Sequence, residues 1–370
     1  MTKKPLRREP EKRLHSLDAL RGFDMFWITG GGMLAIAISN LAGLEWLETQ
    51  MHHVKWEGFR FLDLVFPLFM FISGVAIPFS ITAKLEKNIP RKKLFRKIFK
   101  RLIILILLGM LYNGAFRKAG LTDIRIPSVL GQIGVAYFFS ALIVIYSHSF
   151  RSRFIWLGAI LLIVALVQLL VPVPDIGAGV LTPEGCINGY IDRLLIPGKL
   201  YGGFFDPEGI LCSLSATGIT LMGTIAGHIL RNKKTSDWHK FGYLVLAGIS
   251  GISLALVLST FYPVIKSCWT STFNLLAGGI SFLLLSLFYL VIDHWGFKSW
   301  AFYFRVIGMN SIFVYLLTEI VDFKRITDFF LGWLAKPMGD TGNLIMIIGT
   351  LIIVWIILFY MYRKKIFFRV

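Results

Sequence analysis

Residues 62–83 read LDLVFPLFMFISGVAIPFSITA, and this stretch decides the fold class. It contains one charged side chain, Asp63, and its length matches the roughly 20 apolar residues that a helix needs to cross a bilayer. Similar apolar runs recur along the chain, at residues 22–42, 102–116, 127–147, 154–171, 210–230, 241–261, 272–292, 302–320 and 342–362. The sequence therefore predicts an all-α polytopic membrane protein with about ten transmembrane helices.

The composition of the whole chain agrees with a lipid environment. Of its 370 residues, 56% are hydrophobic and 16% are charged, whereas soluble proteins carry about a quarter charged residues. The formal charge of +18 comes from short basic clusters between the apolar runs, which is a pattern of membrane topology. We therefore expect the lipid bilayer as the surroundings and no nucleic-acid partner.

The distribution of lysine and arginine predicts the orientation. With the N-terminus inside, 28 of the 39 basic residues fall on the cytoplasmic side, in residues 3–21, 84–101, 151–153, 231–240, 298–305 and 363–369. Because cytoplasmic connections carry such an excess, both termini are expected to be cytoplasmic. The N-terminus lacks the apolar core and cleavage site of a signal peptide, so we expect it to be retained.

A single transmembrane domain is expected over residues 1–370, with no soluble domain and no internal repeat. Two outer-face connections, residues 43–61 and 173–209, combine aromatic, acidic, glycine and proline residues, and function is expected there. The sequence leaves open whether Cys186 and Cys268 pair. Walker, HExxH, GxSxG and cysteine–histidine metal patterns are absent, so no metal is expected.

The first group of residues that can carry chemistry is HHVKWEGF at residues 52–59, followed by Asp63. An imidazole at a membrane mouth can take a proton from an amine or attack an acyl carbon. Alternatively, the two histidines simply lie in the interfacial zone with nearby tryptophans. Asp63 can orient a histidine, bind a cationic amine, or serve only as an acid favoured at a helix N-terminus.

Further polar groups border the outer face. Arg125 precedes the span at residues 127–147, and Gln132 lies about one turn deeper, where a buried amide needs a partner. Asp206 and Glu208 lie in the turn FDPEG, which suits binding of hydroxyl or amino groups, although Asp-Pro-Glu is also an ordinary helix start.

The order of these segments resembles the transmembrane acyltransferase family of the lysosomal heparan-α-glucosaminide N-acetyltransferase and its bacterial relatives. The matching segments span almost the entire chain: RLHSLDALRGFDMF (13–26), GGG (30–32), HVKWEGFRFLDLVFPLFMFISG (53–74), RIPSVLGQIGVAYF (125–138), GYIDRLL (189–195), FDPEGIL (205–211), GMNSIFVY (308–315) and YRKKIF (362–367).

The resemblance implies that acetyl-CoA enters from the cytosol and that a glucosamine amine is acetylated on the outer side. The family's essential histidine precedes Trp by three positions and Gly by five, which places the catalytic role on His53, with Trp56 and Gly58 matching. We assign acceptor binding to Asp63, Arg125, Asp206 and Glu208, and acyl-CoA binding to Arg21, Gln132, Asn310 and Ser311. Arg21 can instead pin neighbouring helices, and Asn310 and Ser311 can serve helix packing.

One departure is Ile28, since the lysosomal pattern has an asparagine two positions before the glycine triplet. Thr29 or another donor must replace that asparagine, or the acceptor differs. The short cytoplasmic loops resemble the bacterial branch, in a plasma (inner) membrane. An O-acyltransferase of a cell-envelope glycan and a transporter of a small polar solute stay open as alternatives. The small residues Gly218, Gly223 and Gly227 can pack helices within one protomer or in a homodimer.

Overall fold

The computed structural model describes residues 14–115, 123–147 and 149–368. The basic head at residues 1–13, expected to be cytoplasmic, lies outside the described residues. Within the described ranges the chain is helical, and its only extended pairs are the isolated bridges Glu57–Ile265 and Val173–Gly177. The predicted all-α class is confirmed.

The described residues contain eight helical runs that are long and apolar enough to cross a membrane. Four are single helices: α7 (Val129–Tyr146), α8 (Phe150–Leu170), α10 (Ile210–Arg231) and α11 (Asp237–Leu258). The others are composite: α1 (His15–Phe26), η1 (Trp27–Gly31) and α2 (Gly32–Ala42); α4 (Phe61–Ile77), η2 (Pro78–Thr82) and α5 (Ala83–Leu85); α12 (Ser271–Phe288) and η5 (Tyr289–His294); α15 (Phe323–Ala335), η6 (Lys336–Met338) and α16 (Gly339–Arg363). The polytopic character is therefore confirmed.

The two other predicted spans are helical but do not meet the same criterion. The span at residues 102–116 is the second half of α6 (Arg91–Tyr112), whose first half is rich in lysine and arginine. The span at residues 302–320 is divided into α13 (Phe302–Gly308) and α14 (Ser311–Ile320), because Asn310 leaves the helical conformation. Two shorter helices, α3 (Glu45–Gln50) and α9 (Ile187–Leu195), lie in the predicted outer connections.

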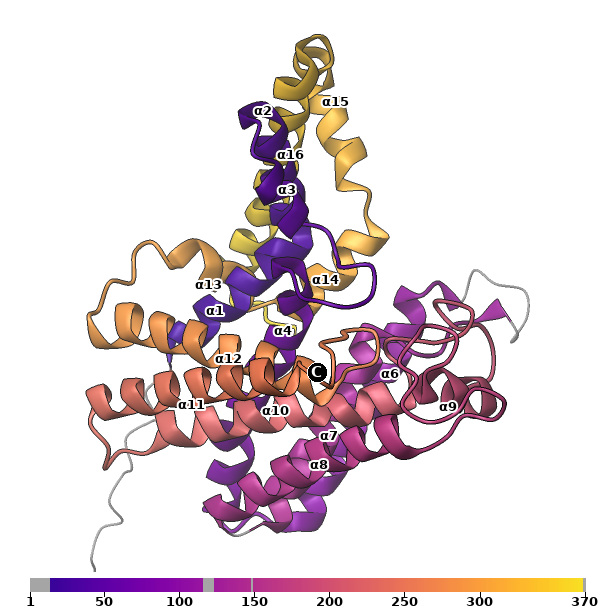
Figure 1. Ribbon diagram of the computed structural model, residues 1–370. Coiled ribbons are helices and arrows are strands. Elements are labelled where there is room, and N and C mark those ends of the chain that lie inside the picture. Colours follow the sequence, from indigo (N-terminus) through magenta and orange to yellow (C-terminus); the bar gives the residue numbers. More distant parts are fainter. Residues whose placement is uncertain (1–13, 116–122, 148, 369–370) are drawn as a thin grey trace, which may run out of the picture.

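The first predicted span is bent. Gly30 has a φ of 144°, a value that residues with a side chain rarely adopt, and α1 and α2 therefore run in different directions. Beyond the bend α2 packs on α16, which in turn packs on α15. Figure 1 shows these three helices rising together from the layer that contains α10, α11 and α12.

The centre of the molecule is the packing of α10 on α4. A Cβ atom added to Gly74 would lie 1.9 Å from the carbonyl oxygen of Thr220, and one added to Gly223 would lie 2.0 Å from that of Phe71. The two backbones approach this closely only because both positions are glycine. Gly227 faces Val75 and Gly218 faces Leu161, so the predicted small-residue face packs helices within one protomer.

The connections meet at two opposite ends of the bundle. At one end, which we call the mouth, contacts join the loop that follows α3, the segment before α7, the long connection around α9 and the turn between α11 and α12. At the other end Arg231 pairs with Glu86, and the backbone N–H groups of His15 and Ser16 donate to Asp293. This grouping follows the predicted alternation of connections, and the compartment that each end faces stays a prediction.

Candidate active site

His53, Asp63 and Lys266 meet where the chain enters α4. Nδ1 of His53 lies 2.7 Å from Oδ1 of Asp63, and Nζ of Lys266 lies 3.3 Å from the same oxygen. The ammonium group also lies 3.1 Å from Nδ1 of His53. One carboxylate therefore holds both an imidazole and an ammonium group at the mouth.

Asp63 is fixed by its place in the helix. It is the third residue of α4, and its Oδ2 accepts hydrogen bonds from the backbone N–H groups of Arg60 (3.1 Å) and Val54 (3.5 Å). A carboxylate at this position caps the helix and is stabilised by its dipole. The Asp63 side chain is fully buried, so its geometry suits an orienting role toward His53 better than direct contact with an acceptor.

Because an ionised carboxylate can only accept a hydrogen bond, the contact with Asp63 favours the Nδ1–H tautomer of His53. If Nδ1–H donates to Asp63, Nε2 keeps its lone pair. The His53 side chain is 55% exposed, so a reactant can reach Nε2. His52 is also exposed, but its nearest acid is Glu48, at 3.8 Å in the adjacent helix turn. Of the two histidines, His53 is therefore the one that contacts a buried carboxylate, which can orient it as a general base.

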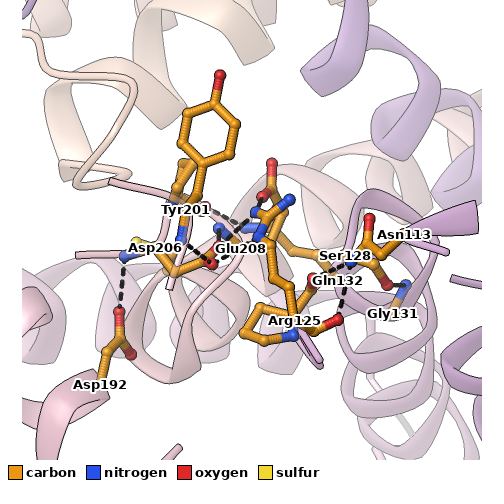
Figure 2. A network of polar contacts seen from close by, with 12 residues as sticks. Asn113, Arg125, Ser128, Gly131, Gln132, Asp192, Tyr201, Asp206 and Glu208 are labelled. Carbon is orange, nitrogen blue, oxygen red and sulfur yellow. Dashed lines mark hydrogen bonds and ion pairs between the residues drawn. The ribbon is translucent and has the colours of Figure 1, made fainter. Parts of the chain in front are cut away.

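A second cluster forms around Arg125. Its guanidinium donates to both oxygens of Asp206, at 2.7 Å from Nε and 2.6 Å from Nη2, and it also pairs with Glu208 (Figure 2). Asp206 is fully buried and additionally accepts the backbone N–H groups of Tyr201 and Glu208. Such a bidentate pair is geometrically rigid. Asp206 thus fixes the conformation of the loop that precedes α10, while Glu208 lies beside open space.

Neighbouring side chains hold this cluster in place. Asp192 on α9 accepts the backbone N–H groups of Asp206 and Ile210, and Asn113 donates to the backbone carbonyls of Arg125 and Pro127. Figure 2 shows Asp192 on one side of Asp206 and Asn113 on the far side of Arg125. The conformation of the segments that precede α7 and α10 is therefore set by buried polar contacts.

Burial shifts the ionisation of the groups outside the membrane-spanning helices. It raises the pKa of Glu208 to about 7, although the charge of Arg125 opposes this shift. Burial also raises the pKa of Asp192 to about 6. The pKa of Lys266 is lowered by burial, against the opposing effect of Asp63. Glu208 thus titrates near neutral pH, where a binding group can switch its charge.

A cavity of about 430 Å³ opens beside Glu208. Gln132 also lines it, and the side-chain amide of Gln132 lies 3.4 Å from the carbonyl oxygen of Pro207. Gln132, which the sequence assigned to acyl-CoA, therefore lies next to the residues assigned to the acceptor. His53, Asp63, Arg125, Asp206 and Gln132 all lie at the mouth end with Glu208.

The remaining predicted site residues lie elsewhere. Arg21 is on α1 and lies 3.9 Å from Asp18. Asn310 donates to the carbonyl of Ile366 and accepts the N–H of Phe368, so it holds the C-terminal segment. Ser311 begins α14 and is buried. The roles of these three residues in acyl-CoA binding stay predictions.

Sequence reasoning missed Lys266. Its only signal was a lysine in an outer connection, and nothing in the spacing linked that connection to His53. Thr29, named as a substitute for the family's asparagine, donates its hydroxyl to the carbonyl of Met25 within its own helix. The structure places Lys266 beside His53, and the role of Thr29 stays a prediction.

The three cysteines are buried free thiols. Cys186 and Cys268 lie in one apolar cluster with Ile265, against which Trp56 packs. They are thus neighbours but do not form a disulfide. Among the described residues, no group of three or more His, Cys, Asp or Glu side chains is arranged to hold a metal ion.

Comparisons with known proteins agree with the family resemblance. Residues 13–174 match a family described as a domain of unknown function (DUF5009). The heparan-alpha-glucosaminide N-acetyltransferase of Mus musculus is 28% identical over 98% of this chain, and that of Homo sapiens is 28% identical over 97%. The chain spans 62% and 60% of the lengths of these two proteins. The resemblance inferred from the motifs is therefore confirmed: over nearly its whole length, this chain is similar to the heparan-alpha-glucosaminide N-acetyltransferases.

Proposed function

We propose that the protein is a membrane-bound acyltransferase that moves the acetyl group of cytosolic acetyl-CoA to the amine of a glucosaminide on the outer face. The observation that carries the proposal is the pairing of exposed His53 with buried Asp63. The names of the two relatives support the reaction type. The bilayer that holds the protein would be a bacterial plasma membrane, and its partner there would be a second copy of the chain.

In direct transfer, Nε2 of His53 takes a proton from the sugar amine while the amine nitrogen attacks the thioester carbonyl. The C–S bond then breaks and the CoA thiolate leaves, taking up a proton. Lys266 lies beside His53 and would stabilise the negative charge that develops on the carbonyl oxygen. Asp63 would stabilise the imidazolium during the step.

In the alternative route, Nε2 attacks the thioester and forms an acetyl-histidine, which the amine then cleaves. Kinetics separate the two routes. Parallel double-reciprocal lines, together with acetyl-histidine trapped in the absence of acceptor, would exclude direct transfer.

Glu208 and Arg125 provide the acceptor side. A carboxylate at the cavity can bind an ammonium or hydroxyl group, and Arg125 fixes its position. The charge of Glu208 also acts on Lys266, which supports an acceptor site near the proposed catalytic pair. Acetyl-CoA would approach from the basic end, where Arg21 is a candidate for phosphate contact.

The test is transfer from radiolabelled acetyl-CoA to glucosamine-terminated sugars by purified protein. We expect His53→Ala to abolish product and the matched variant His52→Ala to retain it. Product in the form of hydroxylamine-sensitive esters would instead indicate an O-acyltransferase. Uptake of labelled sugar into proteoliposomes without acetyl-CoA consumption would favour a transporter and contradict the proposal.

A further inference from the structure

A long groove separates α7 from α8. Both helices pack on α10 but barely touch each other. A cavity of about 610 Å³ lies between the three helices, and its lining is almost entirely apolar. Leu214 forms part of it and is the only exposed residue of α10, which is otherwise the most deeply buried span in the described chain. Leu214 thus forms part of the floor of the groove, on the helix that α7 and α8 both contact.

The groove continues to the mouth. Phe139 and Leu214 line both the 610 Å³ cavity and the 430 Å³ cavity beside Glu208, so the two cavities adjoin at these side chains. The combined groove follows α7 from Ser128 to Ser147. At about 1.5 Å per residue this is about 28 Å, close to the hydrocarbon thickness of a bilayer.

The mouth end of the groove is polar. The carboxylate of Glu208 borders it, and so does Gln132, which is only 1% exposed. Oε1 of Gln132 has no hydrogen-bond partner among the residues that the structure describes. A buried amide oxygen without a partner is costly, so this end of the groove favours a ligand that brings hydrogen-bond donors.

We propose that the acceptor is a glycolipid, with its amino sugar at Glu208 and Gln132 and its hydrocarbon chain in the groove between α7 and α8. This inference rests on the proposed function, since it names the acceptor class. Sugar hydroxyl and ammonium groups supply a donor for the unpartnered Oε1 of Gln132 and further donors for the carboxylate of Glu208, which Arg125 already contacts. A hydrocarbon chain attached to the sugar fills the apolar part of the groove. If the acceptor were a sugar without such a chain, bulk lipid would occupy this part.

Two other occupants fit less well. Acyl-CoA carries amide N–H groups in its pantetheine arm, but these amides would lie without partners along the apolar length of the groove. A phospholipid headgroup carries a phosphate, whose acceptor oxygens cannot satisfy the unpartnered Oε1 of Gln132. A glycolipid has hydrogen-bond donors in its sugar and a hydrocarbon chain behind it. It therefore fits both the polar end and the apolar part of the groove.

The activity test compares dodecyl glucosaminide with methyl glucosaminide as acceptors in phosphatidylcholine nanodiscs. For the wild type we expect kcat/KM to be at least about tenfold higher for the dodecyl compound, since burying two methylenes already suffices for this factor. Leu214→Trp, which fills the groove, should bring the ratio close to one. Leu246→Trp is the matched control, because Leu246 is 63% exposed on α11, away from the groove. In the Leu246→Trp variant the dodecyl compound partitions into the bilayer as it does for the wild type. This variant should therefore keep the wild-type ratio of the two kcat/KM values.

A binding test does not depend on activity. Dodecyl glucosaminide with a photoreactive group in its chain should label peptides from α7 and α10, and unlabelled dodecyl glucosaminide should compete. Labelling without any acetyl transfer would retain the glycolipid site and contradict the proposed reaction. If the protein acetylated methyl glucosaminide as efficiently as dodecyl glucosaminide, and the photoreactive probe labelled no peptides from α7 and α10, the glycolipid inference alone would be overturned. Equal competition by phosphatidylcholine, or crosslinks between the α7 helices of two copies, would overturn it as well.

Discussion

The ring of Trp56 meets the ring of Phe205 edge to face, with centroids 5.0 Å apart. Trp56 lies three residues after His53, and Phe205 directly precedes Asp206. The contact therefore joins the loop that carries the proposed base to the loop that carries the proposed acceptor site. Trp56 also donates its Nε1–H to the carbonyl of Leu181, at 2.6 Å, which fixes the orientation of the indole.

Replacing Trp56 should misalign the two loops. Trp56→Phe keeps a ring but removes the hydrogen bond to Leu181, and we expect a loss of about 1 kcal/mol, roughly fivefold in kcat/KM if the whole loss falls on the transition state. Trp56→Ala removes both contacts and should cost more. Steady-state kinetics with both substrates measures the effect. Trp46→Ala is the control, since Trp46 is 64% exposed, and equal losses in Trp46→Ala and Trp56→Ala would contradict the alignment role.

His53 and Asp63 should act as one unit. Asp63→Asn can no longer favour the Nδ1–H tautomer of His53, so we expect kcat to fall by about 10²–10⁴, as loss of general-base catalysis predicts. Because the two residues act on the same step, the double variant with His53→Ala should be little worse than His53→Ala alone. Initial rates at saturating acetyl-CoA test this, and additive losses would show independent roles.

Lys266 offers a test of charge at the site. Lys266→Met leaves the buried carboxylate of Asp63 without its ammonium partner and should lower both kcat and the apparent unfolding temperature. Lys266→Arg keeps the charge and should restore stability more fully than kcat, since a planar guanidinium fits the ammonium position poorly. Thermal unfolding and kinetics on the same samples separate the two effects. Full activity in Lys266→Met would exclude a role for the ammonium in catalysis.

Much of the fold was predictable because lipid offers no hydrogen-bond partners. A long apolar run must therefore form a helix, in which its backbone N–H and C=O groups bond to one another. The runs around α4, α7 and α10 followed this rule. The break at Asn310 and the bend at Gly30 did not, since an apolar run looks the same whether its helix is straight or divided. These irregular points depend on tertiary contacts, such as the hydrogen bonds between Asn310 and the C-terminal segment.

Contacts within the candidate site were predictable only between residues that lie close together in the sequence. His53 and Asp63 are ten residues apart and straddle one helix start, so their meeting followed from the sequence. The partners of Arg125 lie more than 80 residues away, and the Lys266–His53 contact spans 213 residues. Contacts at such separations depend on helix packing, which apolar periodicity does not encode. Gln132 was predicted from the sequence to bind the donor; it lines the cavity beside Glu208, and its role stays a prediction.

The acceptor affinity should depend on pH through Glu208. Because burial raises the pKa of Glu208 to about 7, this carboxyl is protonated below that pH and ionised above it. An ammonium acceptor binds the ionised form, so the acceptor KM should fall as pH rises from 6 to 8 through about 7. The acetyl-CoA KM should stay level. Glu208→Gln should remove this part of the pH dependence, and an unchanged profile in that variant would assign the titration to another group, such as the sugar amine itself.

Helix packing at the centre can be tested with two glycines. A Cβ atom at Gly223 would lie 2.0 Å from the backbone carbonyl of Phe71, so Gly223→Ala must push α10 away from α4 and should cost about 1–3 kcal/mol. Gly158 on α8 has no atom within 4 Å of an added Cβ, so Gly158→Ala should be neutral or stabilising by up to about 1 kcal/mol through helix propensity. Apparent unfolding temperatures in one detergent, at one heating rate, compare the variants. If Gly223→Ala proved as stable as Gly158→Ala, the close approach of α4 and α10 would be refuted, and with it the scaffold that places Asp63 and Glu208 at the same end of the bundle.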